Sequence, residues 1–83
     1  MEHATIRTKI FYNTYMKPGD HIAWRWLNGL AQGVVKSVHS ESVTIESKGK
    51  LITRHGTKDN PAIIITHKSG NDVLKLSSEV QKT

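Results

Sequence analysis

The sequence predicts an all-β domain, a small barrel of five to six short antiparallel strands with a short C-terminal helical turn. From Pro18 onward, short runs rich in Val, Ile, Thr and Trp are separated by turn residues, at the spacing of about eight to twelve positions that is typical of all-β sandwiches and barrels. The 83 residues, 36% of them hydrophobic, suffice for one domain with a small core. Strands this short do not fill a two-layer sandwich, whereas a closed barrel hides their edges.

The predicted strands each keep apolar residues on one face, as the two-residue period of a strand requires. An SH3-like barrel is the natural arrangement for such runs. The strands are His21–Leu27, Ala31–His39, Ser42–Ser47, Lys50–Arg54, Ala62–Lys68 and Asp72–Leu76. The expected core residues are Ile22, Trp24, Val35, Val38, Val43, Ile45, Ile52, Ile63, Ile65, Val73 and Leu76.

Turn residues separate these strands. Asn28-Gly29 is expected to supply the positive φ angles of a tight hairpin, and Lys48-Gly49 to reverse the chain after the third strand. Asp59-Asn60-Pro61 predicts a turn, because proline removes a backbone donor and favours an extended residue before it. A further reversal is expected at residues 69–72, and a single 3₁₀ or α turn at Ser77 or Ser78.

The N-terminal segment fits neither period. Ile6 and Ile10 suit one helix face, whereas Thr8, Ile10 and Tyr12 suit alternation along a strand. We therefore expect residues 1–16 to be an extension, helical or disordered, that precedes a barrel of residues 17–83.

Composition narrows the classes of function. Twelve Lys and Arg against seven Asp and Glu give a formal charge of +5, which favours an acidic partner such as nucleic acid. The absence of cysteine excludes disulfides, thiolate zinc sites and cysteine nucleophiles. No apolar run approaches the roughly 18 residues that a membrane span needs. We expect a cytoplasmic monomer or weak homodimer with no cofactor and no membrane partner.

Several short motifs in order resemble one known family. They are the opening "KPGDHIAWRW", the strand "GVVKSV", the turn "KDNPAIII" and the ending "KSGNDVLKLSSEV". Together they resemble the hypervirulence-associated protein Tudor domains over residues 17 to about 81. The resemblance implies a Tudor-like or SH3-like barrel and brings neither catalytic residues nor an agreed ligand.

Catalysis and metal binding find little support in the sequence. Among the histidines, at positions 3, 21, 39, 55 and 67, no two stand at the i, i+4 spacing of a zinc helix. No G-x-S-x-G motif, paired carboxylates or glycine-rich phosphate loop is present. We therefore expect a protein that is not an enzyme and holds no metal.

The two tryptophans are predicted to have different roles. Trp24 stands where the barrel needs bulk, so it is expected in the core, while Trp26 lies near the strand end and is the better candidate for a binding surface. A methyl-lysine cage needs several aromatic faces around the cation. Its other rings would have to come from Phe11, Tyr12 and Tyr15, which all precede the barrel.

The predicted function is that of a non-enzymatic interaction module that binds an acidic partner through a basic hairpin. Nucleic acid is one candidate partner, with lysine and arginine on phosphates and Trp26 stacked on a base. The alternative is a protein-binding or self-associating domain that uses an edge strand or an aromatic groove. The candidate binding residues are Arg25, Trp26, Lys48, Lys50, Arg54 and Lys58.

Overall fold

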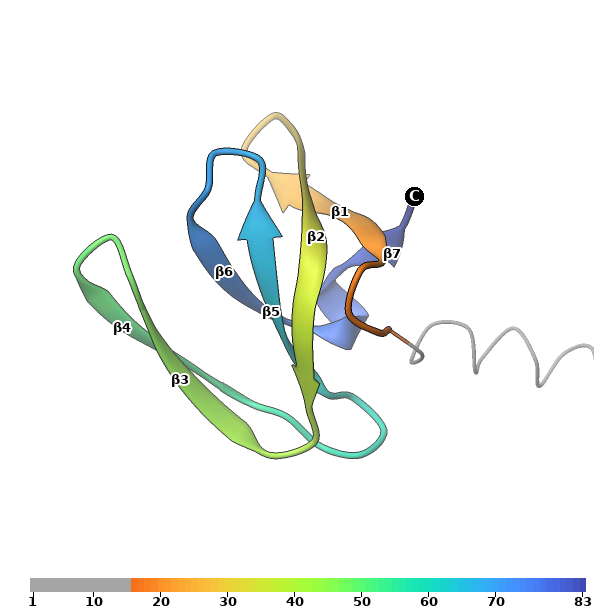
Figure 1. Ribbon diagram of the computed structural model, residues 1–83, viewed down its shortest axis with the longest axis vertical. Helices are drawn as coiled ribbons and strands as arrows, with labels where there is room; N and C mark the ends of the chain where they lie inside the picture. The colour runs from red at the N-terminus through yellow and green to blue at the C-terminus, as the bar shows by residue number, and fades with distance from the viewer. Residues whose placement is uncertain (1–15) are drawn as a thin grey trace, which may run out of the picture.

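The computed structural model describes residues 16–83, which form the predicted small all-β barrel (Figure 1). Apart from Met16, which is buried in the core, the expected N-terminal extension lies outside the described residues. The elements are β1 (His21–Trp26), β2 (Gly29–His39), β3 (Ser42–Ser47), β4 (Lys50–His55), β5 (Ala62–His67), β6 (Asp72–Leu76), the 3₁₀ turn η1 (Ser77–Glu79) and β7 (Gln81–Lys82).

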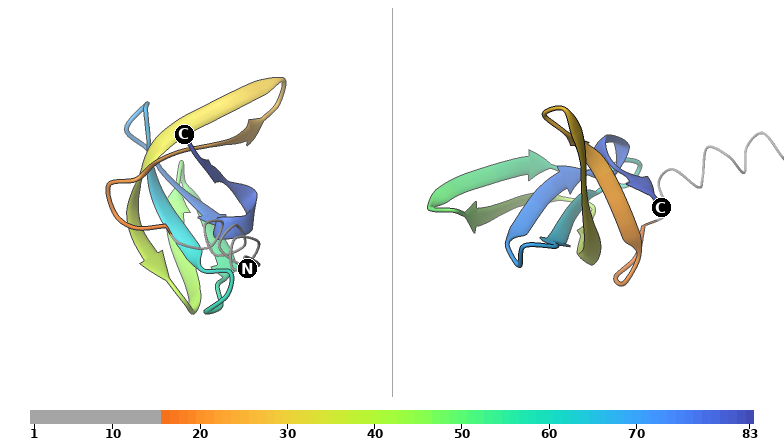
Figure 2. Two further views of the ribbon diagram at one scale, coloured as in Figure 1. Left: turned by 90° about the vertical axis from the view of Figure 1, so that its right-hand side faces the viewer. Right: turned by 90° about the horizontal axis from the view of Figure 1, so that it is seen from above.

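The strands form two antiparallel sheets. The main sheet has the order β6-β5-β2-β1-β7, and β3 and β4 form a separate two-stranded hairpin. Seen from above, the hairpin lies to one side of the main sheet, next to β6 (Figure 2). No backbone pairing joins β4 to β6 in the described chain, so the barrel that the sequence predicts as closed has an open seam there.

The predicted strands are confirmed to within two residues, and the turn after Lys48 is confirmed by positive φ at Lys48 and Gly49. The first hairpin corrects the prediction of positive φ at Asn28-Gly29. Gly29 is already paired with Trp26, so the turn consists of Leu27 and Asn28, and Leu27 takes the left-handed φ of 52°. The two-residue β7 is an addition that the sequence pattern does not show.

The core is small and lies on one face of the main sheet. Five of the eleven expected residues are buried in it, namely Ile22, Trp24, Val35, Ile63 and Ile65, and it also contains Met16 and Ala31; Val38 and Val73 pack against it. The expectation was wrong for Val43, Ile45 and Ile52, which are only half-buried because their hairpin lies outside the main sheet. On β6 the prediction paired Val73 with Leu76, but residues three apart lie on opposite faces of a strand. Val73 packs against the core, Leu76 is half-buried, and the buried residue between them is Leu74.

The two tryptophans differ in burial as predicted. Trp24 is 5% exposed and Trp26 is 59% exposed, although both rings project from the same side of β1. In β2, Ala31 is the partner of Trp24 and Gly29 is the partner of Trp26. Because Trp26 is the last residue of β1 and faces a glycine, its ring extends beyond the core.

Gly33 lies where β2 passes between β1 and β5. It pairs with Ile22 on one side and His67 on the other. A Cβ at this position would lie 2.6 Å from the Thr66 carbonyl oxygen and 2.7 Å from Cγ2 of Ile65. Only a residue without a side chain therefore allows this approach of the strands.

The C-terminal turn is tied to the loop before β5. The side-chain amide of Asn60 donates to Oγ of Ser78 at 3.0 Å and accepts from its backbone N–H at 2.9 Å. The backbone N–H of Ser77 donates to the Pro61 carbonyl at 2.9 Å. These bonds hold η1 against the end of the barrel and fix the position of Glu79.

Asp20 fastens the start of the barrel to its end. Its Oδ2 accepts from the backbone N–H of Lys17 at 3.0 Å and lies 3.4 Å from Nζ of Lys82. The backbone hydrogen bond, together with the ammonium groups of Lys17 and Lys82, lowers the pKa of Asp20 below its ordinary value despite the opposing effect of burial. The carboxylate is therefore charged at neutral pH and joins the turn before β1 to β7.

Trp24→Ala is expected to lower the free energy of unfolding by about 3–5 kcal/mol, because it leaves a cavity in a small core. Trp26→Ala is the matched control and should change stability by less than about 0.5 kcal/mol. Urea unfolding followed by circular dichroism measures both. Equal losses in the two variants would contradict the assignment of the pair.

Gly33→Ala is expected to destabilise the fold by about 1–3 kcal/mol, since the new methyl group overpacks against the β5 backbone. Gly29→Ala provides the control, because a Cβ there meets nothing within 4 Å and the backbone φ is not positive. Thermal unfolding of the two variants should differ clearly. If the midpoint for Gly33→Ala equals that of the wild type, the close approach at this position carries no constraint.

Candidate functional site

An open cleft of about 430 Å³ lies between the main sheet and the β3–β4 hairpin. It exists because the hairpin leaves the main sheet without pairing to β6. Its volume is in the range of small-ligand sites, at about 300–1,000 Å³. The lining residues are Trp24, Trp26, Ala31, Ser47, Lys48, Lys50, Ile52, Arg54, His67, Ser69, Asn71, Val73, Leu74 and Lys75.

The charge of this cleft has one sign. Lys48, Lys50 and Arg54 come from the hairpin and Lys75 comes from β6. None of the described residues that line the cleft is Asp or Glu. Four cations around a partly enclosed, largely apolar space attract an anion more strongly than the same cations scattered over a surface, because water screens them less.

The alternation of the hairpin explains why its cations gather on the cleft side. Lys50, Ile52 and Arg54 stand two residues apart, so they share one face of β4. The opposite face carries Leu51, Thr53 and His55, all exposed. The half-buried Ile52 thus packs toward the main sheet and brings its two basic neighbours with it.

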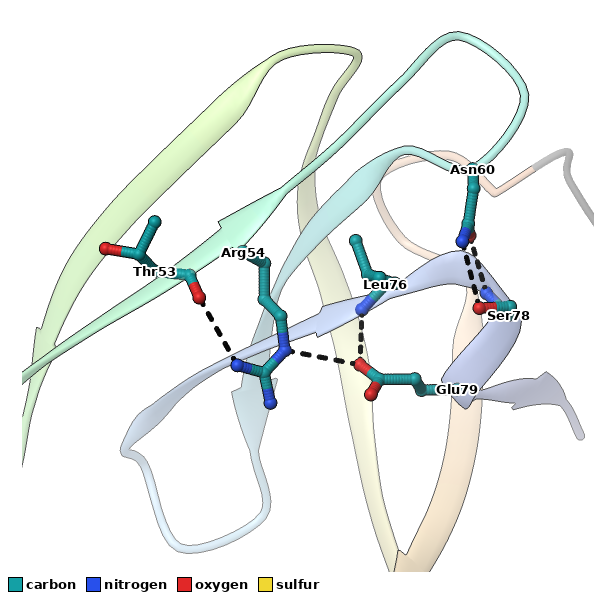
Figure 3. A network of polar contacts seen from close by, with 6 residues as sticks. All are labelled: Thr53, Arg54, Asn60, Leu76, Ser78 and Glu79. Atoms are coloured by element: carbon teal, nitrogen blue, oxygen red, sulfur yellow. Dashed lines mark hydrogen bonds and ion pairs between the residues drawn. The ribbon is translucent and has the colours of Figure 1, made fainter.

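Among the described residues, polar contacts join the hairpin to β6 and to η1. Oγ of Ser47 donates to the Asp72 carbonyl at 2.9 Å, and Nε of Arg54 lies 3.5 Å from Oε1 of Glu79. The same Glu79 oxygen accepts from the backbone N–H of Leu76 at 2.8 Å, as Figure 3 shows. Arg54 therefore spans the seam, with its guanidinium held between the cleft and η1.

Rings line the side of the cleft formed by the main sheet. Trp24 contacts His67 edge to face, with ring centroids 5.8 Å apart and an interplanar angle of 61°. The backbone N–H of Ser69 donates to Nδ1 of His67 at 3.0 Å. Trp26, at the outer end of the wall, presents an exposed indole to the cleft that the hairpin cations also line.

The β6 strand presents its edge to the same space. Val73, Leu74 and Lys75 are consecutive and all line the cleft, although successive side chains of a strand point to opposite faces. β6 pairs only with β5, so its other edge is free of backbone pairing within the described chain. The cleft thus contains a strand edge as well as a basic aromatic wall.

The structure brings together four of the six candidate binding residues, namely Trp26, Lys48, Lys50 and Arg54. Arg25 lies on the opposite face of β1, and Lys58 lies in the loop between β4 and β5, so neither lines the cleft. Lys75 and His67 are additions. Lys75 pairs with Ile63, and His67 pairs with Gly33. In the sequence, the only signal for either residue is its inward position in the alternation of its strand.

Other kinds of site find no counterpart in residues 16–83. No three His, Asp or Glu side chains in this region gather closely enough to hold a metal ion. The described chain also contains no helix with the length and apolar character for crossing a bilayer. Phe11, Tyr12 and Tyr15, the further rings that a methyl-lysine cage would need, lie outside the described residues.

Comparison with known proteins identifies a family for this chain. Residues 19–80 match a family model described as the hypervirulence associated proteins TUDOR domain. Neither a curated protein nor a solved structure matches the chain. The match runs from the turn before β1 to just past η1, and of the strands only β7 lies beyond it.

Proposed function

The chain belongs to the hypervirulence-associated Tudor domain family, and from this premise we propose that its cleft binds single-stranded nucleic acid. Family membership supports a small interaction module in general. The observation that carries the finer proposal is the cleft itself, in which four cations and the exposed Trp26 stand together without a carboxylate among the described lining residues.

Each component of the cleft suits a different part of a single strand. Lys48, Lys50 and Lys75 suit phosphate groups, because ammonium groups bind phosphates as point charges. Trp26, 59% exposed, offers an indole face on which an unpaired base can stack. A duplex keeps its bases stacked inside, so a cleft with one aromatic face suits an unpaired strand better.

The charge of the cleft also argues against a methylated lysine or arginine as ligand. Such a cation would enter a space lined by four like charges, and the two tryptophans would have to outweigh that repulsion. We therefore assign the cleft to an anionic partner, and no catalytic step is part of the proposal.

A labelled single-stranded oligonucleotide, titrated in fluorescence anisotropy at several salt concentrations, tests the proposal. Affinity should fall steeply between about 50 and 200 mM salt. Replacing Lys48 and Lys50 together by Ala should flatten the slope of log K against log salt by about 1.4, since each lost phosphate contact on a single strand removes about 0.7. Trp26→Ala should weaken binding without changing that slope.

Lys58→Ala is the control for general charge, because Lys58 has the same charge outside the cleft. It should leave the salt slope close to that of the wild type. The proposal fails if no binding is seen at low salt, or if Lys58→Ala reduces the slope per lysine as much as the cleft variants do.

The free edge of β6 favours a second candidate function, the binding of an extended acidic peptide. A peptide strand beside Val73–Lys75 would pair with unpaired backbone groups and place its carboxylates near the cleft cations. A poly-glutamate peptide that protects the β6 amides from hydrogen exchange, where the oligonucleotide does not, would select this function over nucleic-acid binding.

A further inference from the structure

The end of the β1–β2 hairpin exposes large apolar side chains on both of its faces. Among the described residues, the large apolar side chains that remain mostly exposed are Trp26 at 59%, Leu27 at 83%, Leu30 at 62% and Leu51 at 76%. Three of these four belong to this one hairpin end. Such a concentration is unusual for a surface that meets only water.

The geometry of the three residues differs from that of a flat docking patch. Trp26 lies on the cleft side of β1, whereas Leu30 pairs with Arg25 and shares the opposite face. Leu27 lies between them in the turn itself. A partner protein that packs on one face would cover Trp26 or Leu30 and leave the other in water, whereas a medium that surrounds the tip covers all three.

The turn is also built from a residue that its backbone disfavours. Leu27 has a φ of 52°, a conformation in which a Cβ crowds the carbonyl oxygen and which glycine and asparagine adopt more easily. An exposed leucine in this position is explained neither by folding nor by solubility. Lys48 takes a similar φ of 54° in the β3–β4 turn, so the conformation belongs to the two-residue turn, and the unusual feature is the large apolar side chain that Leu27 exposes there.

The charges near the tip are positive. Residues 21–40, which span both strands of the hairpin, contain no Asp or Glu. Arg25 pairs with Leu30 on one face, and Lys48 and Lys50 line the same cleft as Trp26 on the other. Tryptophan and leucine flanked by basic residues are the combination that lies in the interface of an anionic bilayer.

We propose that the β1–β2 hairpin end, with Trp26, Leu27 and Leu30, inserts into the headgroup layer of an anionic lipid membrane, with Arg25, Lys48 and Lys50 facing the lipid phosphates. This surface goes beyond the proposed nucleic-acid function, because Leu27 and Leu30 lie outside the cleft. The association is peripheral and reversible, since a short apolar tip does not reach across the bilayer. The proposal thus departs from the expectation of no membrane partner, which rested on the lack of a spanning segment in the sequence.

Flotation with phosphatidylcholine vesicles, with and without about one third phosphatidylserine, tests the proposal. The protein should float with the anionic vesicles, and tryptophan emission should shift to the blue, because Trp26 leaves water while Trp24 is already buried. The double variant Leu27→Asn with Leu30→Thr should reduce partitioning on the order of tenfold or more.

Stability and nucleic-acid binding separate this proposal from its alternatives. Leu27→Asn suits the left-handed turn, so the variant should unfold at the same or a higher urea concentration than the wild type. The oligonucleotide affinity of the double variant should equal that of the wild type. Lys58→Ala should leave vesicle binding unchanged.

The proposal is overturned if the protein binds neither kind of vesicle. It is also overturned if the double variant still binds anionic vesicles without a blue shift, because that result indicates adsorption through lysines alone. It is equally overturned if the double variant loses oligonucleotide affinity, which would place the tip in the nucleic-acid site. A change from dimer to monomer in light scattering on the same substitutions would assign the tip to a second copy of the chain.

Discussion

The structure depends on the close passage of β2 between its two neighbours. β2 pairs with β1 on one edge and with β5 on the other, and at Gly33 the approach leaves no room for a side chain. Further along, a bulge between Val35 and Ser37 bends β2 against β5. These two features curve the main sheet so that one face closes around Ile22, Trp24 and Ile65, and the core of so short a chain depends on that curvature.

The same curvature leaves the β3–β4 hairpin outside the main sheet. β4 and β6 approach without pairing, and side chains rather than backbone bonds span the seam, with Ser47 on the Asp72 carbonyl and Arg54 on Glu79. An exposed ion pair contributes little to stability, about 1 kcal/mol or less. The hairpin is therefore attached to the rest of the barrel through side-chain contacts rather than a backbone ladder, and the cleft lies along that seam.

Alternation and turn residues were enough to predict the strands and the different fates of Trp24 and Trp26. They were not enough to place the turn at Leu27, because glycine after asparagine favours the Asn28-Gly29 turn and only the pairing of Gly29 with Trp26 moves it by one residue. The candidate site was partly predictable for a similar reason. Lys48, Lys50 and Arg54 are neighbours in sequence and remain together, whereas Lys75 joins them and Lys58 leaves them only through the path of β6 and the loop after β4.

The ion pair between Glu79 and Arg54 distinguishes Arg54 from the three lysines of the cleft. The Glu79 carboxylate reaches Arg54 from η1, outside the cleft, and uses the same oxygen to accept the Leu76 N–H. Arg54 is thus the one cation of the wall with a carboxylate within 4 Å in the described chain, while no such ion pair occupies Lys48, Lys50 or Lys75. Like charges left together without counter-charges repel one another. A ligand with several negative charges at regular spacing relieves that repulsion at more than one lysine, whereas a single carboxylate relieves it at one, so the arrangement favours a polyanion over an isolated acidic group.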